Sequence, residues 1–264
     1  MRAAPTPVLL RGTIAAARNA QGLLCDAHVL AEVGSAARAY SLAALAVEEA
    51  GKAVSLSVLT MMPEALRARA PVGRMLEWHQ LKQGQGLFIA TVPCRVPDIA
   101  RTLVAMPAGE LARFLTALNA SSADEADRLK RRGLYVDVGQ GGRIREPSEI
   151  TEADVLSELA RAGQATSAAG QLLEPETEAR LVNPPAEGVE LSRAMVSALT
   201  EARYGRTPEA AADILLDMVG KLRHRVAGTP VPSDLRSLRH QGNTARVRDR
   251  DAPTPAEPWP GRIS

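Results

Sequence analysis

Aromatic residues are scarce in this sequence of 264 residues: two Trp, three Tyr and two Phe make up 3% of the chain. β-Sandwiches favour aromatic and β-branched residues, whereas close-packed helices can be built from Ala, Leu and Val. The hydrophobic content of 45% is ordinary and excludes a chain that is disordered throughout. The composition therefore predicts an all-α protein.

Cysteines and long hydrophobic runs are also lacking. Cys25 and Cys94 are too few for a disulfide framework or a four-thiolate zinc site, and a reducing cytosol is the simplest location. The longest apolar run, Leu42–Val47, is far shorter than the roughly 20 residues that span a bilayer. The first 12 residues hold too short an apolar stretch for a secretory signal. We therefore expect a cytoplasmic protein without a membrane segment.

The chain also lacks a large excess of charge of one sign. Its formal net charge is +2, and residues 228–264 hold six of the 32 basic and four of the 30 acidic residues, which leaves 26 of each elsewhere. Because duplex DNA is bound mainly through phosphate contacts with Lys and Arg, this neutral body argues against a DNA-binding protein. Six prolines and few apolar residues predict that residues 228–264 are a disordered tail.

Apolar periodicity and helix-terminal signals predict helices at about residues 11–33, 35–62, 72–91, 108–131, 151–173, 187–203 and 207–226. Thr151 and Asp154 have the spacing of a capping box. We expect an extended pair or an ordered loop within residues 133–150, and a linker between Pro175 and Pro184. The predicted organisation is a helical domain at 1–175, a helical extension at 176–227 and the tail.

The helix predicted at residues 35–62 has the most regular apolar stripe. Its members recur every three or four residues and define one buried face: they are Tyr40, Ala43, Val47, Gly51, Val54 and Val58. Gly51 within this stripe would let a neighbouring backbone approach closely.

Two adjacent carboxylates, Glu48 and Glu49, interrupt this otherwise apolar helix. Their side chains point about 100° apart, so at least one lies near the packed side and needs a partner. Glu48 and Lys52 stand four residues apart in the favourable order. The plainer interpretation is therefore a helix-surface ion pair that contributes roughly 0.3–0.5 kcal/mol.

A second group of candidate residues lies in the helix predicted at 72–91. His79 and Lys82 share one face, whereas Arg74 lies about 140° around the helix from His79. An Arg and a His that converge on a phosphate could cleave an RNA backbone, with the His removing the 2′-hydroxyl proton or protonating the leaving oxygen. The competing interpretation is a solvated Arg74 and a core His79 that is hydrogen-bonded to Glu48 or Glu49.

Motifs for metals and cofactors are lacking. A dinuclear site in a helical bundle uses Glu-x-x-His pairs, but Glu77 and His79 are two residues apart. The glycine clusters at residues 84–86 and 139–142 lack the Gly-Lys-Ser/Thr ending of a phosphate loop. We therefore expect no metal and no cofactor.

Four sequence blocks follow one another in an order typical of a known family: Asn19 with Asp26-Ala27, Glu48-Glu49-Ala50-Gly51-Lys52, His79-Gln80-Leu81-Lys82 and Leu134-Tyr135-Val136-Asp137. With these blocks, the chain resembles the AbiV family of bacterial abortive-infection proteins over about residues 11–169. That family is similar to the HEPN superfamily, helical bundles that include many metal-independent endoribonucleases. Their signature is an Arg, four to six residues and then a His, a spacing that Arg74 and His79 fit.

The resemblance implies a HEPN-like bundle in an anti-phage protein that arrests growth or translation in infected cells. It implies that His79 is a general acid or base, that Arg74 or Lys82 stabilises the phosphorane, and that Glu48 or Glu49 orients His79. Asp26 and Lys52 would support this group. The resemblance also implies a homodimer, an RNA substrate and a phage-encoded activator protein.

The alternative is a catalytically inactive helical binding module that acts through a protein partner. In that case the same polar residues form a buried network that fixes helix register. A network closed within one chain favours the binding module, and a His79 side chain that is open to a ligand favours the enzyme.

Overall fold

The computed structural model describes residues 4–68, 76–91, 98–107, 109–110, 123–138, 144–145, 147, 150–201 and 208–228. The fold is all-α, as predicted, with one two-residue ladder in this part of the chain. The helices are α1 (Thr6–Glu32), α2 (Ala36–Met61), α3 (Glu64–Arg67), α5 (His79–Thr91), α6 (Ile99–Ala105), α8 (Ala123–Leu134), α9 (Glu152–Gly170), η4 (Gln171–Leu173), α10 (Pro175–Val182), α11 (Ala186–Glu201) and α12 (Pro208–Ala227), and the strands are β1 (Asp137–Val138) and β2 (Ile144–Arg145).

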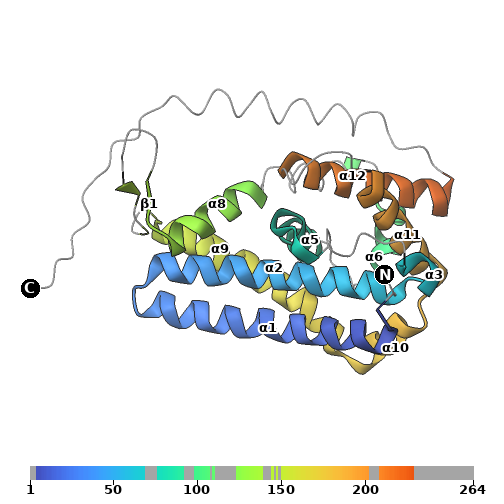
Figure 1. Cartoon of the computed structure of the whole chain (residues 1–264), viewed down its shortest axis with the longest axis horizontal. Helices are drawn as coiled ribbons and strands as arrows, with labels where there is room; N and C mark the ends of the chain where they lie inside the picture. The colour runs from blue at the N-terminus through green and yellow to red at the C-terminus, as the bar shows by residue number, and fades with distance from the viewer. Residues whose placement is uncertain are drawn as a thin grey trace, which may run out of the picture.

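α1 and α2 form a long antiparallel hairpin along the base of the molecule (Figure 1). Gly34 turns the chain with φ +76°, and the N–H groups of Gly34 and Ser35 donate to the carbonyls of Ala31 and Leu30 at 3.0 and 2.8 Å. Glycine adopts this left-handed conformation without steric cost and so ends α1. Both helices bury alanines, and such small side chains let helix axes approach closely.

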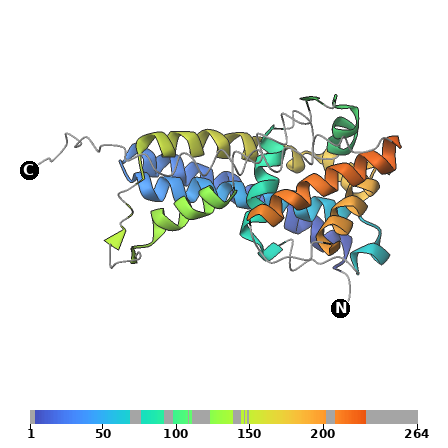
Figure 2. The ribbon, with the colours of Figure 1, turned by 90° about the horizontal axis from the view of Figure 1, so that it is seen from above.

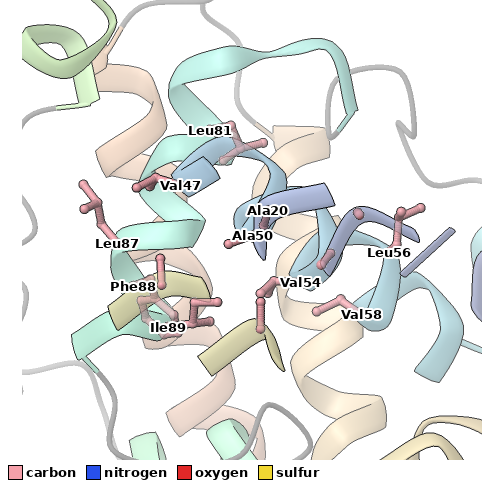
Figure 3. Packing of buried hydrophobic residues seen from close by; sticks show 14 of the residues in the cluster. Ala20, Val47, Ala50, Val54, Leu56, Val58, Leu81, Leu87, Phe88 and Ile89 are labelled. Atoms are coloured by element: carbon pink, nitrogen blue, oxygen red, sulfur yellow. The ribbon is translucent and has the colours of Figure 1, made fainter. Parts of the chain in front are cut away.

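α2 is the central helix of the fold, because α1, α5, α8, α9 and α11 all pack against it. Every residue of the stripe predicted in this helix is buried. Figure 3 shows Val47 and Val54 of α2 in one core with Leu87, Phe88 and Ile89 of α5. The second predicted helix is thus confirmed in its bounds and in its buried face.

α5 crosses α2 steeply, whereas α8 and α9 run along the N-terminal half of α2 on its two sides (Figure 2). α12 covers the face of α5 that is remote from α2 (Figure 1). The helix predicted at 72–91 is confirmed from His79 to Thr91, and residues 72–75 lie outside the described residues. α6 falls where the sequence analysis predicted no helix.

The segment before α9 contains the predicted extended pair. β1 and β2 are antiparallel, with Asp137 opposite Arg145 and Val138 opposite Ile144. α9 then begins with the predicted capping box, in which the Asp154 N–H donates to Thr151 Oγ1 at 3.2 Å and the Thr151 N–H donates to Asp154 Oδ2 at 3.0 Å. Of the helix predicted at 108–131, residues 109–110 and 123–131 are helical, and 108 and 111–122 lie outside the described residues.

The linker predicted between Pro175 and Pro184 is wrong, because α10 occupies most of it. Pro175 begins this helix, where its missing N–H leaves no hydrogen bond unmade and its fixed φ suits the first turn. Arg180 donates two hydrogen bonds to Asp98, at 2.7 and 2.5 Å, and so joins α10 to α6.

The C-terminal helices share the core of the N-terminal ones. Leu181, Ala194 and Leu222 of α10, α11 and α12 belong to the same cluster of buried side chains as the α2 stripe. The division at residue 175 stays a prediction, and the tail from residue 229 lies outside the described residues. No helix within the described ranges is long and apolar enough to cross a bilayer.

Candidate functional site

The two adjacent carboxylates of α2 have different surroundings. Glu48 is 2% exposed, whereas the Glu49 side chain is 18% exposed and lies 3.2 Å from the Lys52 amine. This confirms the expectation that one carboxylate lies on the packed side. A buried carboxylate without partners is strongly destabilising, so Glu48 must have partners. These partners are the other members of the candidate site.

Glu48 has two partners, which come from two other helices. Its Oε2 lies 2.6 Å from Nδ1 of His79 at the start of α5, and its Oε1 accepts a hydrogen bond from Nζ of Lys130 in α8. An ionised carboxylate can only accept hydrogen bonds, so the proton between Glu48 and His79 belongs to Nδ1. In the neutral imidazole, the lone pair then lies on Nε2, on the opposite edge of the ring.

His79 is not a core residue, because 55% of its side chain is exposed. The interpretation of His79 as a core histidine bonded to Glu48 or Glu49 is therefore right about the hydrogen bond, which goes to Glu48, and wrong about burial. Within the described residues, Glu48 is the only hydrogen-bond or ion-pair partner of His79. More than half of the His79 side chain is accessible to a ligand.

A close crossing of α2 and α5 brings His79 and Lys82 to Glu48. A Cβ added to Gly51 would lie 1.8 Å from the Lys82 carbonyl oxygen, and one added to Gly86 would lie 2.3 Å from the Val47 carbonyl oxygen. Only glycine fits at both positions, since real Cβ atoms do not approach within 3.0 Å. The prediction that Gly51 admits a neighbouring backbone is confirmed.

Lys82 lies one turn after His79 and is 7% exposed. No hydrogen bond or ion pair to its amine occurs among the described residues. Burial lowers the pKa of this amine, the Glu48 and Glu49 carboxylates oppose that shift, and the Lys52 and Lys130 amines reinforce it. Lys82 is thus a buried cation that an anionic ligand would stabilise.

The remaining predicted residues stand apart from Glu48. The ion pair predicted between Glu48 and Lys52 is wrong, because Lys52 pairs with Glu49, three residues away. Asp26 is exposed on α1, and no hydrogen bond or ion pair joins it to the cluster in the described part of the chain. Arg74 lies outside the described residues.

Comparison with known proteins identifies the family. A family model, HEPN_AbiV, described as AbiV, matches residues 8–167, more than half of the chain. The chain belongs to the HEPN_AbiV family. Membership implies a function of the abortive-infection type. No curated protein and no solved structure matches the chain significantly.

The matched residues of this HEPN_AbiV chain run from α1 into α9 and contain the whole cluster around Glu48. They end within residues 11–169, over which the sequence resembles the AbiV family. The helices α10–α12 lie beyond the match, although they pack against α2, α5 and α6.

Sequence reasoning missed Lys130 and Asp127 of α8 as members of the site. Lys130 Nζ lies 2.9 Å from Asp127 Oδ1, and Asp127 Oδ2 lies 2.9 Å from Arg131 Nη2. Both missed side chains are at least nine-tenths buried. Lys130 lies four residues before the block that starts at Leu134, and nothing in the sequence spacing identifies it as the basic residue that faces a carboxylate 82 residues earlier.

The described residues contain no group of three or more His, Cys, Asp or Glu side chains arranged as metal ligands. The site consists of one exposed imidazole, two buried carboxylates and two buried amines. These groups can exchange protons and attract an anion.

Proposed function

We propose that this protein is an endoribonuclease of the abortive-infection type, with His79 as its general acid or base. The observation that supports this best is the Glu48–His79 pair: a buried carboxylate holds Nδ1 at 2.6 Å while 55% of the His79 side chain is exposed. General acid–base catalysis requires a positioned imidazole that a substrate can reach.

The proposed reaction uses the 2′-hydroxyl of RNA as the nucleophile. Nε2 of His79 takes the hydroxyl proton, and the 2′-oxygen attacks the adjacent phosphorus. The bond to the 5′-oxygen of the next nucleotide then breaks, and this oxygen is protonated as it leaves. Lys82 is the described cation on the His79 face of α5, and either this amine or the Arg74 guanidinium would stabilise the charge on the phosphorane.

The proposal includes the partners that the resemblance implies. Two chains would form a homodimer in the cytoplasm of a bacterial cell, each chain contributing one His79 to a shared RNA site. A phage-encoded protein would activate the dimer, and RNA cleavage would arrest growth or translation.

One observation favours the alternative, a helical binding module. Glu48, Lys130, Asp127 and Arg131 satisfy one another within a single chain, as a network that fixes helix register would. In the binding module, His79 only completes this network, and a protein partner mediates growth arrest.

The deciding experiment compares wild type, His79→Ala and His224→Ala under tight induction, with and without phage infection. His224 is an exposed histidine of α12 and serves as the matched control. Growth and total-RNA integrity are followed, and circular dichroism verifies that all three chains are folded.

The ribonuclease predicts RNA fragments with wild type and His224→Ala, and intact RNA with folded His79→Ala. Growth arrest by all three proteins with intact RNA would overturn the ribonuclease and favour the binding module. Fragments that persist in His79→Ala would overturn the role of His79.

A further inference from the structure

We infer that Lys130, itself held by Asp127, is a positioning residue for the Glu48–His79 pair: its amine holds the Glu48 carboxylate against Nδ1 and its charge opposes protonation of the imidazole, so that the lone pair stays on Nε2. The catalytic meaning of this role rests on the proposed function. The effect on His79 can be measured without RNA.

The contacts form a chain of alternating charge. His79 and Lys130 occupy the two oxygens of Glu48, and Asp127 and Arg131 continue the chain from Lys130. Lys130 is 6% exposed, so water screens its charge little. Two carboxylates and two cations make up this chain of charges: Glu48, Asp127, Lys130 and Arg131. Their charges sum to zero, so no positive charge on the His79 imidazole is needed to balance Glu48.

The fold fixes the backbone of Lys130 as well as its amine. Ser41 Oγ in α2 donates to the Lys130 carbonyl oxygen at 3.1 Å. One turn later in α8, a Cβ added to Gly133 would lie 2.2 Å from Ser41 Oγ and 2.4 Å from the Ala37 carbonyl oxygen. α8 is therefore pressed against α2 at the point from which the Lys130 side chain reaches Glu48.

Lys130 is suited to remain charged. Burial acts to lower the pKa of its amine, but the Glu48 and Asp127 carboxylates more than offset burial, so the pKa is raised. A permanent positive charge on one oxygen of Glu48 opposes the binding of a second positive charge, an imidazolium, at the other. Without Lys130, the carboxylate would attract a proton to His79 more strongly.

The test is an NMR titration of the His79 imidazole in the full chain labelled with ¹⁵N. The His79 signals are assigned by their loss in His79→Gln, and the nitrogen shifts report which ring nitrogen carries the proton. Lys130→Met removes a positive charge from the cluster and Asp127→Asn removes a negative one. The other charged groups around the pair, Glu49, Lys52, Lys82 and Arg131, stay in place.

We expect the His79 titration midpoint to move to higher pH by at least about half a unit in Lys130→Met, and to lower pH in Asp127→Asn. Each substitution removes one member of the contact chain that joins α8 to Glu48, so a merely structural role would shift both midpoints in the same direction or neither. Either of those results would overturn the inference.

Three controls complete the design. Lys130→Arg keeps the charge and should retain the wild-type midpoint. Arg193→Met removes a positive charge from α11 beside Ser192, which contacts Val58, ten residues or about 15 Å along α2 from Glu48, and should also leave the midpoint unchanged. If Lys130→Met does not fold, Asp127→Asn decides, because an unchanged or raised midpoint in that variant contradicts the role.

The two proposals fail separately. Opposite shifts in a protein that cuts no RNA would leave the positioning role intact and reject the ribonuclease. RNA cleavage that depends on His79, together with a His79 titration midpoint that does not change in Lys130→Met, would support the ribonuclease and reject the positioning role.

Discussion

Glu48 and Glu158 are both 2% exposed, yet the fold treats them differently. Glu48 in α2 is bound by His79 and Lys130, which come from α5 and α8. Glu158 in α9 has its ion-pair partner on its own helix, where Arg161 lies 2.9 Å away and is 27% exposed. Burial raises the pKa of the Glu158 carboxyl, and Arg161 and Tyr40 only partly oppose that shift.

The difference separates a carboxylate whose partners come from two other helices from one whose charged form is disfavoured by burial. A partner three residues away is available to any helix, so the Glu158 pair needs little tertiary structure. The Glu48 contacts exist only when three helices meet. Burying several charged groups together costs desolvation free energy. Such clusters are therefore expected at functional sites.

Glu48→Gln is therefore expected to have the largest effect. Among the described residues, it leaves the buried Lys130 amine with Asp127 as its only acidic partner and removes the anchor of His79, so the free energy of unfolding should fall by about 3–5 kcal/mol. Glu158→Gln keeps the shape of a side chain whose charge is poorly solvated and should change this free energy by less than about 1 kcal/mol at pH 7. Urea denaturation of both variants measures the difference.

Equal losses in the two variants would contradict the comparison. They would mean that Lys130 gains as little from Glu48 as Arg161 gains from Glu158. Circular dichroism before denaturation controls for loss of helix in Glu48→Gln.

The crossing of α2 and α5 provides a second, smaller test. Gly51→Ala places a methyl group against the Lys82 carbonyl and must push the helices apart, which should cost about 1–3 kcal/mol and separate His79 from Glu48. Gly163→Ala in α9 meets no atom within 4 Å and should stabilise its helix by about 0.5–1 kcal/mol. Thermal unfolding distinguishes the two, and a stable Gly51→Ala with an unperturbed His79 signal would refute the close crossing.

The sequence predicted those features that depend on neighbours along the chain. The apolar stripe of α2, the Thr151 capping box and the need for a partner of Glu48 or Glu49 all follow from helical geometry, and the structure confirms them. The predicted ion pair between Lys52 and Glu48 was wrong because a helical residue can contact neighbours both three and four positions away. Glu48 is buried, and Lys52 pairs with the more exposed Glu49, three positions away.

The sequence predicted the close approach of another backbone at Gly51, but it did not predict which side chains of α8 contact α2. Lys130 is one of three consecutive basic residues, and only the docking of α8 on α2 determines which one reaches Glu48. The helix α10 was missed because Pro175 and Pro184 were interpreted as linker boundaries, although proline also begins helices.

The smallest expected effect concerns pH and tests the Glu158 side of the comparison. The pKa of Glu158 lies above its ordinary value of 4.5 in the folded chain. Between these two values Glu158 is more protonated in the folded chain than in the unfolded chain, so its contribution to the free energy of unfolding falls as pH rises through this window. Glu158→Gln cannot titrate and lacks this decrease. Relative to wild type, the variant should therefore gain stability from pH 4.5 upward and reach a constant difference above the raised pKa. Denaturant unfolding at a series of pH values measures that difference, and a gain that appears only on acidification would show that Arg161 and Tyr40 stabilise the charged form after all.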